Sequence, residues 1–372
     1  MSTTASRPIR EVAAIHPDVL RALRPIDCDL HPAPPAMRQL LPYLDTHWRE
    51  AMVTRGIDGL DLAAYPPGAP LSARPDWREG TTRPAADVTA MRAQALDPWN
   101  TRIGILNCLH GAIAMYGEDM GAALARAVND WLAAEWLDRE PRLRASVTVC
   151  MRDPVQAAAE IERRASDRRF VQVLLLVSGD MPLGRRPFWP IYEAAQRHGM
   201  TVGIHAGSTY HHAATPVGWP SYYVEDYVAQ APAMQNQLLS LIAEGVFTKF
   251  PDLRVVLLES GWTWLAPFLW RANKTWRGLR SEVPWVDRAP ADTVRDRVRL
   301  SIQPTDAPPE PAQPARAIEQ MGADDLLLFS TDYPHWQFDA VPLPPGLPER
   351  LLPGIACDNA LGFYPRLKEA IQ

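Results

Sequence analysis

The chain has 372 residues, of which 47% are hydrophobic and 22% charged, and its formal net charge is −5 at pH 7. This length and composition allow one large α/β domain with a sizeable core, whereas the mild negative charge gives no electrostatic case for binding nucleic acid or an anionic membrane surface. The sequence has no run of eighteen apolar residues and no secretory signal at its start, so a cytoplasmic protein that does not bind membranes is expected.

The first chemically informative stretch runs from Ile26 to Pro32 and consists of Ile-Asp-Cys-Asp-Leu-His-Pro. In a β-strand alternate side chains share a face, so Asp27, Asp29 and His31 would project together. Two acids and an imidazole are costly to bury unless they bind a cation, and carboxylate oxygen and neutral imidazole nitrogen are common metal ligands. For this stretch alone, a surface turn ended by Pro32 is the alternative.

Strand patterns and helix patterns alternate along most of the chain. Residues 1–24 are predicted to form an N-terminal arm with at most one short helix. Residues 40–101 are predicted to form a long, irregular, Pro-bearing insertion that serves as a lid or an oligomer arm, with disorder as the alternative. Further strands are predicted at 102–109, 145–150, 171–177, 201–205, 254–259, 298–302 and 326–330. Helices are predicted at 118–137, 154–166, 188–198, 228–244, 262–276 and 312–321, the second of them with Asp153 as its N-cap.

Eight strands separated by helices imply parallel pairing through right-handed crossovers. Eight such units favour closure into a (β/α)8 barrel, the TIM barrel, with long N-terminal and loop insertions. An open doubly wound sheet is the alternative, but no G-x-G-x-x-G motif follows the first strand. Residues 1–372 show no linker or internal repeat, so a single domain is expected, and its long insertions favour a homo-oligomer.

In such a barrel the chemistry lies at the carboxyl ends of the strands. The polar side chains at these ends are Asp29 and His31 (first strand), His110 (past the second), His205 (fifth), Glu259 (sixth), and Asp332 and His335 (past the eighth). Each alone has a structural explanation, such as a buried core histidine for His205 or an Asx turn for Asp332. One metal site explains all of them together, with Asp29, His31, His205, Glu259 and Asp332 as its expected ligands. Asp27 is expected to support these ligands from behind.

Several motifs resemble the amidohydrolase-related (β/α)8 family. They are the opening stretch at 26–32, Gly-Ile-His-Ala-Gly at 203–207, Leu-Leu-Glu-Ser-Gly-Trp-Thr-Trp at 257–264, Phe-Ser-Thr-Asp-Tyr-Pro-His at 329–335 and Asp-Asn-Ala-Leu-Gly-Phe-Tyr at 358–364. The resemblance spans about residues 25–367. It implies a metal-dependent hydrolase, or a non-oxidative decarboxylase of aromatic or dienoic acids, with one zinc or manganese ion.

Two positions depart from the common pattern of that family. Members commonly have His-x-His on the first strand and a histidine after the sixth, where this chain has Asp29 and Glu259. A site rich in carboxylates that also contains histidine suits a pair of hard ions such as iron. This pattern resembles the branch that contains the TIM-barrel non-haem di-iron monooxygenase of platensimycin and platencin biosynthesis.

The branch resemblance implies a monooxygenase of secondary metabolism with two Fe ions. It would hydroxylate a large apolar, coenzyme A-linked small molecule such as a diterpenoid, using O₂ and an electron donor. One alternative is a mononuclear decarboxylase or hydrolase with one Zn or Mn ion. The other is a non-catalytic barrel that binds an acyl thioester.

Roles can be assigned to individual residues on the same resemblance. Glu259, Asp332 and His205 are expected to be catalytic. The candidates to complete a second metal position are His110, His335, His211 and His212. The side chains expected to line a large substrate pocket are Trp219, Tyr222, Tyr223, Trp262 and Trp336, and packing beneath loops is the alternative for each.

Overall fold

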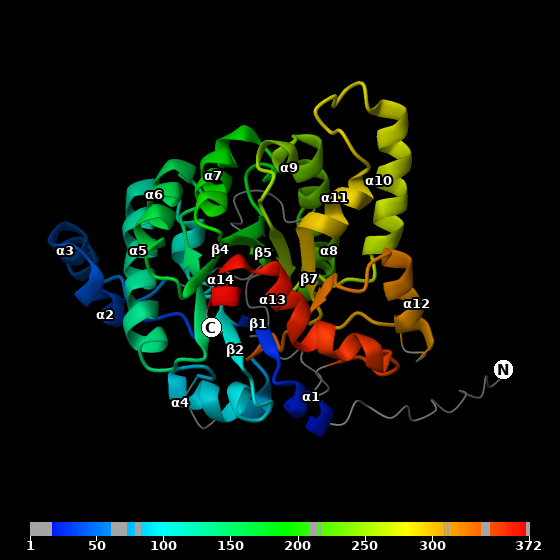
Figure 1. The fold of residues 1–372 in the computed structure, drawn as a ribbon. Helices are drawn as coiled ribbons and strands as arrows, with labels where there is room; N and C mark the ends of the chain where they lie inside the picture. The colour runs from blue at the N-terminus through cyan, green and yellow to red at the C-terminus, as the bar shows by residue number, and fades with distance from the viewer. Residues whose placement is uncertain are drawn as a thin grey trace, which may run out of the picture.

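The computed structural model describes residues 17–60, 73–78, 83–208, 215, 217–308, 310, 312–335 and 343–369. Within these ranges the strands are β1 (Ile26–Leu30), β2 (Ile103–Leu106), β3 (Leu143–Thr148), β4 (Phe170–Ser178), β5 (Thr201–Ser208), β6 (Val255–Leu258), β7 (Val298–Ser301) and β8 (Leu327–Leu328). They form one sheet in sequence order, and each neighbouring pair is parallel. Helices surround the strands (Figure 1), so the predicted (β/α)8 barrel is confirmed.

The α-helices of the described residues are α1 (Pro17–Leu23), α2 (Met37–Leu40), α3 (Thr46–Arg55), α4 (Val88–Met91), α5 (Glu118–Leu132), α6 (Pro154–Arg164), α7 (Trp189–Arg197), α8 (Tyr223–Ala243), α9 (Val246–Lys249), α10 (Leu265–Leu279), α11 (Pro290–Arg297), α12 (Ala312–Met321), α13 (Asn359–Phe363) and α14 (Pro365–Glu369). Short 3-10 or π-helical segments are η1 (Leu41–Tyr43), η2 (Pro75–Trp77), η3 (Arg92–Leu96), η4 (Gly111–Ala114), η5 (Ala133–Leu137), η6 (Arg186–Phe188), η7 (Glu349–Leu351) and η8 (Gly354–Asp358). None of these helices combines the length and the apolar character needed to cross a bilayer.

The predicted strands match the observed ones to within a few residues because their apolar runs are buried on both faces. In β4 every residue from Phe170 to Val177 is buried, as expected for a strand between a barrel interior and a layer of helices. The predicted cap of α6 is also present. The Asp153 side chain accepts hydrogen bonds from the main-chain N–H groups of Val155 and Gln156, both at 3.0 Å.

The structure differs from the prediction where polar caps, rather than apolar periodicity, define a helix. The 40–101 region was expected to be irregular, yet its described parts contain the helices α3 and α4. The first turn of α3 is capped by the Asp45 side chain, which accepts a hydrogen bond from Trp48 N. Helix α8 begins at Tyr223 instead of residue 228. Its first turn is closed by the Glu225 carboxylate, which accepts from Tyr222 N at 2.8 Å, and this turn is too exposed to show an apolar pattern.

The barrel is closed by contacts between β1 and the segment that follows β8. His31 N donates to Tyr333 O at 2.8 Å, and the buried Asp27 carboxylate accepts from Thr331 Oγ1 at 2.6 Å and from Thr331 N at 3.1 Å. We call these four residues the closing seam. Because both sides of the seam end at the same edge of the barrel, side chains from the first and the last strand meet there.

The C-terminal helices α13 and α14 cross the strands at the opposite, amino-terminal end of the barrel (Figure 1). The guanidinium of Arg366 is buried, and among its acceptors are the main-chain oxygens of Phe170 at 2.7 Å and His198 at 2.8 Å. The Tyr364 hydroxyl enters the barrel interior and donates to Gln172 Oε1 at 2.9 Å. This C-terminal segment therefore covers the base of the barrel.

Replacing Arg366 by leucine is expected to lower the free energy of unfolding by about 3 kcal/mol, because buried carbonyls lose a charged donor. Urea denaturation followed by circular dichroism measures the change. Arg350→Leu is the control, since Arg350 pairs with Asp324 at the surface and its loss should change stability by less than about 0.5 kcal/mol. Equal effects of the two substitutions would show that Arg366 does not secure the base.

Candidate metal centre

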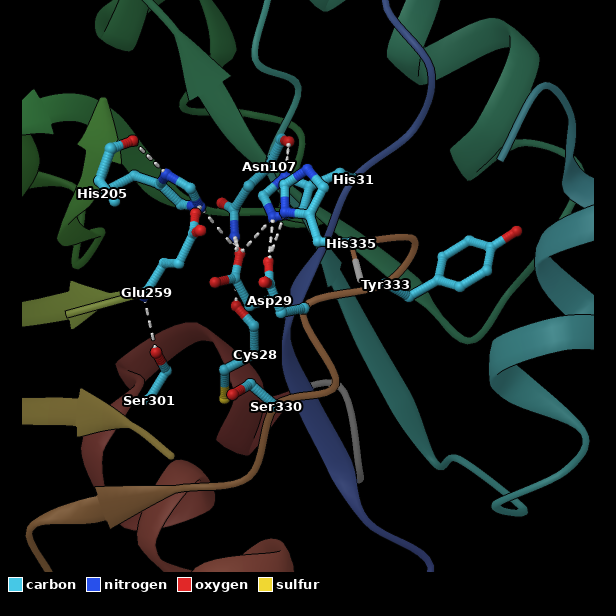
Figure 2. Close-up of polar contacts among 12 residues, drawn as sticks. Cys28, Asp29, His31, Asn107, His205, Glu259, Ser301, Ser330, Tyr333 and His335 are labelled. Atoms are coloured by element: carbon cyan, nitrogen blue, oxygen red, sulfur yellow. Dashed lines mark hydrogen bonds and ion pairs between the residues drawn. The ribbon is translucent and has the colours of Figure 1, made fainter. Parts of the chain in front are cut away.

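Four buried side chains meet at the carboxyl end of the barrel: Asp29, His31, His205 and Asp332. We call them the four-residue cluster, and one donor atom of each lies within 4.8 Å of the others. Asp29 Oδ1 is 3.2 Å from His31 Nε2 and 3.6 Å from His205 Nε2, and Asp332 Oδ1 is 3.1 Å from His31 Nε2. Figure 2 shows Asp29 and His31, from the end of β1, and His205, from β5, with their side chains turned toward one another.

Both histidines of the cluster turn the same ring nitrogen toward the carboxylates. His31 Nδ1 lies 2.9 Å from Asn107 O, and His205 Nδ1 lies 2.7 Å from Ala206 O. Each main-chain oxygen accepts a hydrogen bond from Nδ1, which leaves Nε2 with its lone pair in the neutral ring. Fixing the tautomer in this way is how proteins orient histidine toward a metal.

Three atoms of the four-residue cluster have no hydrogen-bond partner among the described residues: Asp29 Oδ2, His205 Nε2 and Asp332 Oδ2. Buried polar atoms without partners are rare because each one loses the hydration it has in the unfolded chain. A cation placed among them would satisfy all three. Carboxylate oxygen and imidazole nitrogen are ligands of manganese, zinc and iron, so the donor set fits a divalent transition-metal ion.

A second group adjoins the cluster and shares Asp332 with it. Donor atoms of Glu259, Asp332 and His335 also lie within 4.8 Å of one another. His335 Nδ1 is 2.8 Å from Asp332 Oδ1, and its ring stacks on that of His31 with centroids 4.5 Å apart. The Asp332 carboxylate is therefore held from two sides by imidazoles.

Glu259 follows β6 and borders the cluster on the side of His205. Its Oε2 lies 3.5 Å from His205 Nε2, and its Oε1 accepts a hydrogen bond from the Tyr227 hydroxyl at 2.5 Å. Its main-chain N–H donates to Ser301 Oγ at 2.9 Å, and its φ of +51° is uncommon for a residue other than glycine. The conformation is thus held by contacts from neighbouring elements, as backbone strain at functional sites usually is.

The carboxyl groups have opposite pKa shifts. Burial, together with the charge of Asp332, raises the pKa of Glu259 to about 7. Burial opposes the ionisation of Asp332, but the positive charge of the neighbouring His335 holds its pKa well below the usual range. At neutral pH Asp332 is therefore ionised while Glu259 carries a proton in a sizeable share of molecules, which is the arrangement by which two carboxyl groups take different roles.

Six of the nine residues predicted as metal ligands come together in these two groups: Asp29, His31, His205, Glu259, Asp332 and His335. His110 does not, because Asn107 occupies the position directly after β2 and His110 lies farther along the chain. Its Nδ1 accepts a hydrogen bond from Ala112 N at 3.1 Å and caps η4. His211, His212 and Trp336 lie outside the described residues.

The aromatic residues predicted to line a pocket have different environments. Trp262 is fully buried, whereas the side chains of Tyr222 and Trp219 are largely exposed. Tyr223, in the first turn of α8, has its ring 5.8 Å from that of Tyr227, which contacts Glu259. The described contacts therefore bring Tyr223 near the site, and the pocket-lining role of these residues stays a prediction.

Sequence reasoning missed Asn107, which contacts the site directly, and it missed the contact of Tyr227 with Glu259. Asn107 Nδ2 donates to Asp29 Oδ1 at 2.8 Å. A signal for it was present, since it follows β2 directly and the other candidates were chosen at such strand ends. Nothing in the local sequence linked Tyr227 to Glu259, because Tyr227 lies on α8 and is 32 positions from this partner.

Comparison with known proteins adds a family match and several relatives. A sequence model described as amidohydrolase matches residues 26–366. The γ-resorcylate decarboxylase of Polaromonas sp. strain JS666 is 26% identical over 274 residues, which cover 71% of this chain and 82% of that protein.

Solved structures share the fold at lower identity. The 5-carboxyvanillate decarboxylase of Sphingomonas paucimobilis superposes with a TM-score of 0.65 at 20% identity, over 92% of this chain and 99% of its own. The dihydroxybenzoic acid decarboxylase of Polaromonas sp. JS666, with bound manganese, gives 0.63 at 21% identity, over 91% and 96%.

These matches overturn the expectation of a di-iron monooxygenase that uses O₂ and an electron donor on a coenzyme A-linked substrate. The curated relative and both solved structures are decarboxylases, and the dihydroxybenzoic acid decarboxylase contains bound manganese. The expectation depended on Glu259 standing where the family commonly has a histidine, which made the site rich in carboxylates and suggested a pair of hard ions. A buried carboxyl group with a raised pKa serves equally well as a proton donor, so its presence does not specify two irons.

Replacing His205 by alanine is expected to raise the dissociation constant for Mn²⁺ by more than about 100-fold, since a direct ligand should matter more than its supporting contacts. His110→Asn is the matched control, because asparagine also caps a helix and His110 lies outside both groups. Titration of metal-free protein with Mn²⁺, followed by electron paramagnetic resonance, measures both. Weak binding by the His110 variant and normal binding by the His205 variant would reverse the assignment.

Proposed function

The chain belongs to the amidohydrolase family, and from this membership we propose that it is a metal-dependent decarboxylase of an aromatic carboxylic acid. The observation that carries the proposal is a buried Asp-His-His-Asp cluster with three donor atoms that lack hydrogen-bond partners, bordered by Glu259, a buried carboxyl group with a raised pKa. The names of its relatives supply the substrate class, since they act on γ-resorcylate, dihydroxybenzoate and carboxyvanillate.

The four-residue cluster would hold one divalent cation, manganese or zinc. A bound cation of this kind supplies positive charge that attracts and orients the anionic oxygens of an aromatic acid. The protein shields this cation position from water by burying the four side chains. Asp29, His31, His205 and Asp332 each have at most 4% of their surface exposed, so water competes poorly for the same place.

Glu259 is the proposed proton donor. Loss of CO₂ replaces a C–C bond of the ring carbon by a C–H bond, so this carbon must gain one proton. The ring carbon takes the proton from Glu259 with a pair of ring electrons, and the electron pair of the breaking C–C bond then restores the ring as CO₂ leaves. A carboxyl group with a pKa near 7 is suited to this step at neutral pH.

Tyr227 determines how Glu259 faces the cluster. Its hydroxyl holds Oε1, so Oε2 points toward His205. The main-chain contact of Glu259 with Ser301 fixes the other end of the residue. Holding an acid in one orientation before substrate binds reduces the entropy lost on reaching the transition state.

The proposal is tested by supplying manganese-loaded protein with 2,6-dihydroxybenzoate and 5-carboxyvanillate while CO₂ release and O₂ uptake are both recorded. We expect CO₂ release without O₂ consumption. Chelation should abolish the activity, and added Mn²⁺ should restore it. O₂ uptake coupled to turnover, or hydrolysis of an amide or ester without any CO₂ release from the acids, would refute the decarboxylase assignment.

Replacing Glu259 by glutamine is expected to lower kcat by about 100-fold or more, because the proton donor is lost while the shape of the side chain is kept. The affinity for Mn²⁺ should change by less than about threefold, since the four-residue cluster remains complete. Steady-state kinetics and metal titration measure the two effects. Glu193→Gln, on the exposed face of α7, is the control and should retain full activity. A Glu259 variant with normal kcat would disprove its role as the acid.

A further inference from the structure

A continuous line of buried polar side chains crosses the barrel interior from the base to the metal centre. It consists of Tyr364, Gln172, Ser146 and Asn107, each with no exposed surface. Asn107 Oδ1 accepts from Ser146 Oγ at 2.6 Å and from Gln172 Nε2 at 3.0 Å, and Gln172 Oε1 accepts from the Tyr364 hydroxyl at 2.9 Å. Barrel interiors of this fold are usually filled by branched apolar residues, so the line needs an explanation.

The chain makes specific room for this line. A Cβ atom on Gly203 of β5 would lie 2.5 Å from the side-chain amide of Gln172. Glycine at this position therefore allows the amide to occupy the barrel interior. Buried amides are costly unless their hydrogen bonds are made, and here they are made by residues of the line itself.

Asn107 stands at the end of this line and contacts both candidate ligands of β1. Its Nδ2 donates to Asp29 Oδ1 at 2.8 Å and to Cys28 O at 3.2 Å, while its main-chain oxygen accepts from His31 Nδ1 at 2.9 Å (Figure 2). The two donors on Oδ1 prevent the amide from turning over. The N–H groups must therefore face β1, and the carboxylate of Asp29 is held in one rotamer.

We propose that Asn107 is the positioning residue of the metal centre, which sets Asp29 through its side chain and His31 through its main chain before a cation binds. The inference rests on the metal-binding part of the proposed function and on no step of the reaction. Ligands that are already ordered lose less entropy on binding, so the contact raises affinity for the cation. Asparagine suits the task because its amide donates to Asp29, whereas an aspartate would set a second negative charge against it.

The test is the dissociation constant for Mn²⁺ of Asn107→Leu, measured by titration of metal-free protein without substrate. Leucine keeps the approximate shape and the main-chain carbonyl but removes the donor to Asp29. We expect the dissociation constant to rise 10- to 100-fold, which is about the effect of losing a contact that orients a metal ligand. The spectrum of bound Mn²⁺ in electron paramagnetic resonance should also broaden, because Asp29 gains freedom.

Asn129→Leu is the matched control. Asn129 is equally buried, and its amide makes hydrogen bonds with Thr148 O, Thr148 N and Glu160 Oε1. It lies on α5, and these partners belong to β3 and α6 and not to the cluster. Its substitution should lower the melting temperature and leave the dissociation constant within about threefold of the wild type. A general loss of packing would weaken metal binding in both variants alike.

If Asn107→Leu does not fold, Asn107→Ser decides the question, since a serine hydroxyl is too short to hold Asp29 and should also weaken binding by about tenfold or more. A folded Asn107 variant that binds Mn²⁺ as tightly as the wild type would overturn the inference alone. A wild-type protein that binds no divalent metal would overturn the proposed function instead. The two failures are therefore distinguishable.

Discussion

The closing seam is the contact on which the metal centre depends. The Asp27 carboxylate and Thr331 are 304 positions apart in the chain, yet they share two hydrogen bonds at one edge of the barrel. Closure there places Asp29, which follows Asp27 by two positions, against Asp332, which follows Thr331. An open sheet of the same eight strands would leave the first and last strands at opposite edges, and the four-residue cluster would be divided between them.

Bringing these groups together is electrostatically unfavourable until something positive is added. Asp29, Asp332 and Glu259 are all buried, and the only positive charge available within the two described groups is that of their imidazoles. Burial and, after it, the like charge of Asp332 raise the pKa of Glu259. A divalent ion would relieve the repulsion and supply the missing partners at once. The site therefore couples metal binding to the stability of the barrel end that contains it.

The sequence was sufficient to predict the features that follow from the spacing of apolar residues. Alternating apolar runs predicted the barrel, and reading only the strand ends selected Asp29, His31, His205 and Asp332. It was not sufficient where the role of a residue depends on a contact with a residue far away in the sequence. The role of Glu259 is set by burial and by Tyr227 on α8, which no local pattern connects to it. Short capped helices in the 40–101 region were missed because caps are individual polar residues and carry no period.

The missing side chain at Gly203 has an evolutionary consequence. Gln172 fills the space that any larger residue at position 203 would need. The two positions lie on adjacent strands and must therefore change together. A descendant protein can gain a side chain at position 203 only after position 172 has taken a smaller residue. That smaller residue no longer donates a hydrogen bond to Asn107. A change at Gly203, which is not a member of either metal-binding group, would therefore reach the metal centre through Gln172 and Asn107, and positions 172 and 203 should covary across the lineage.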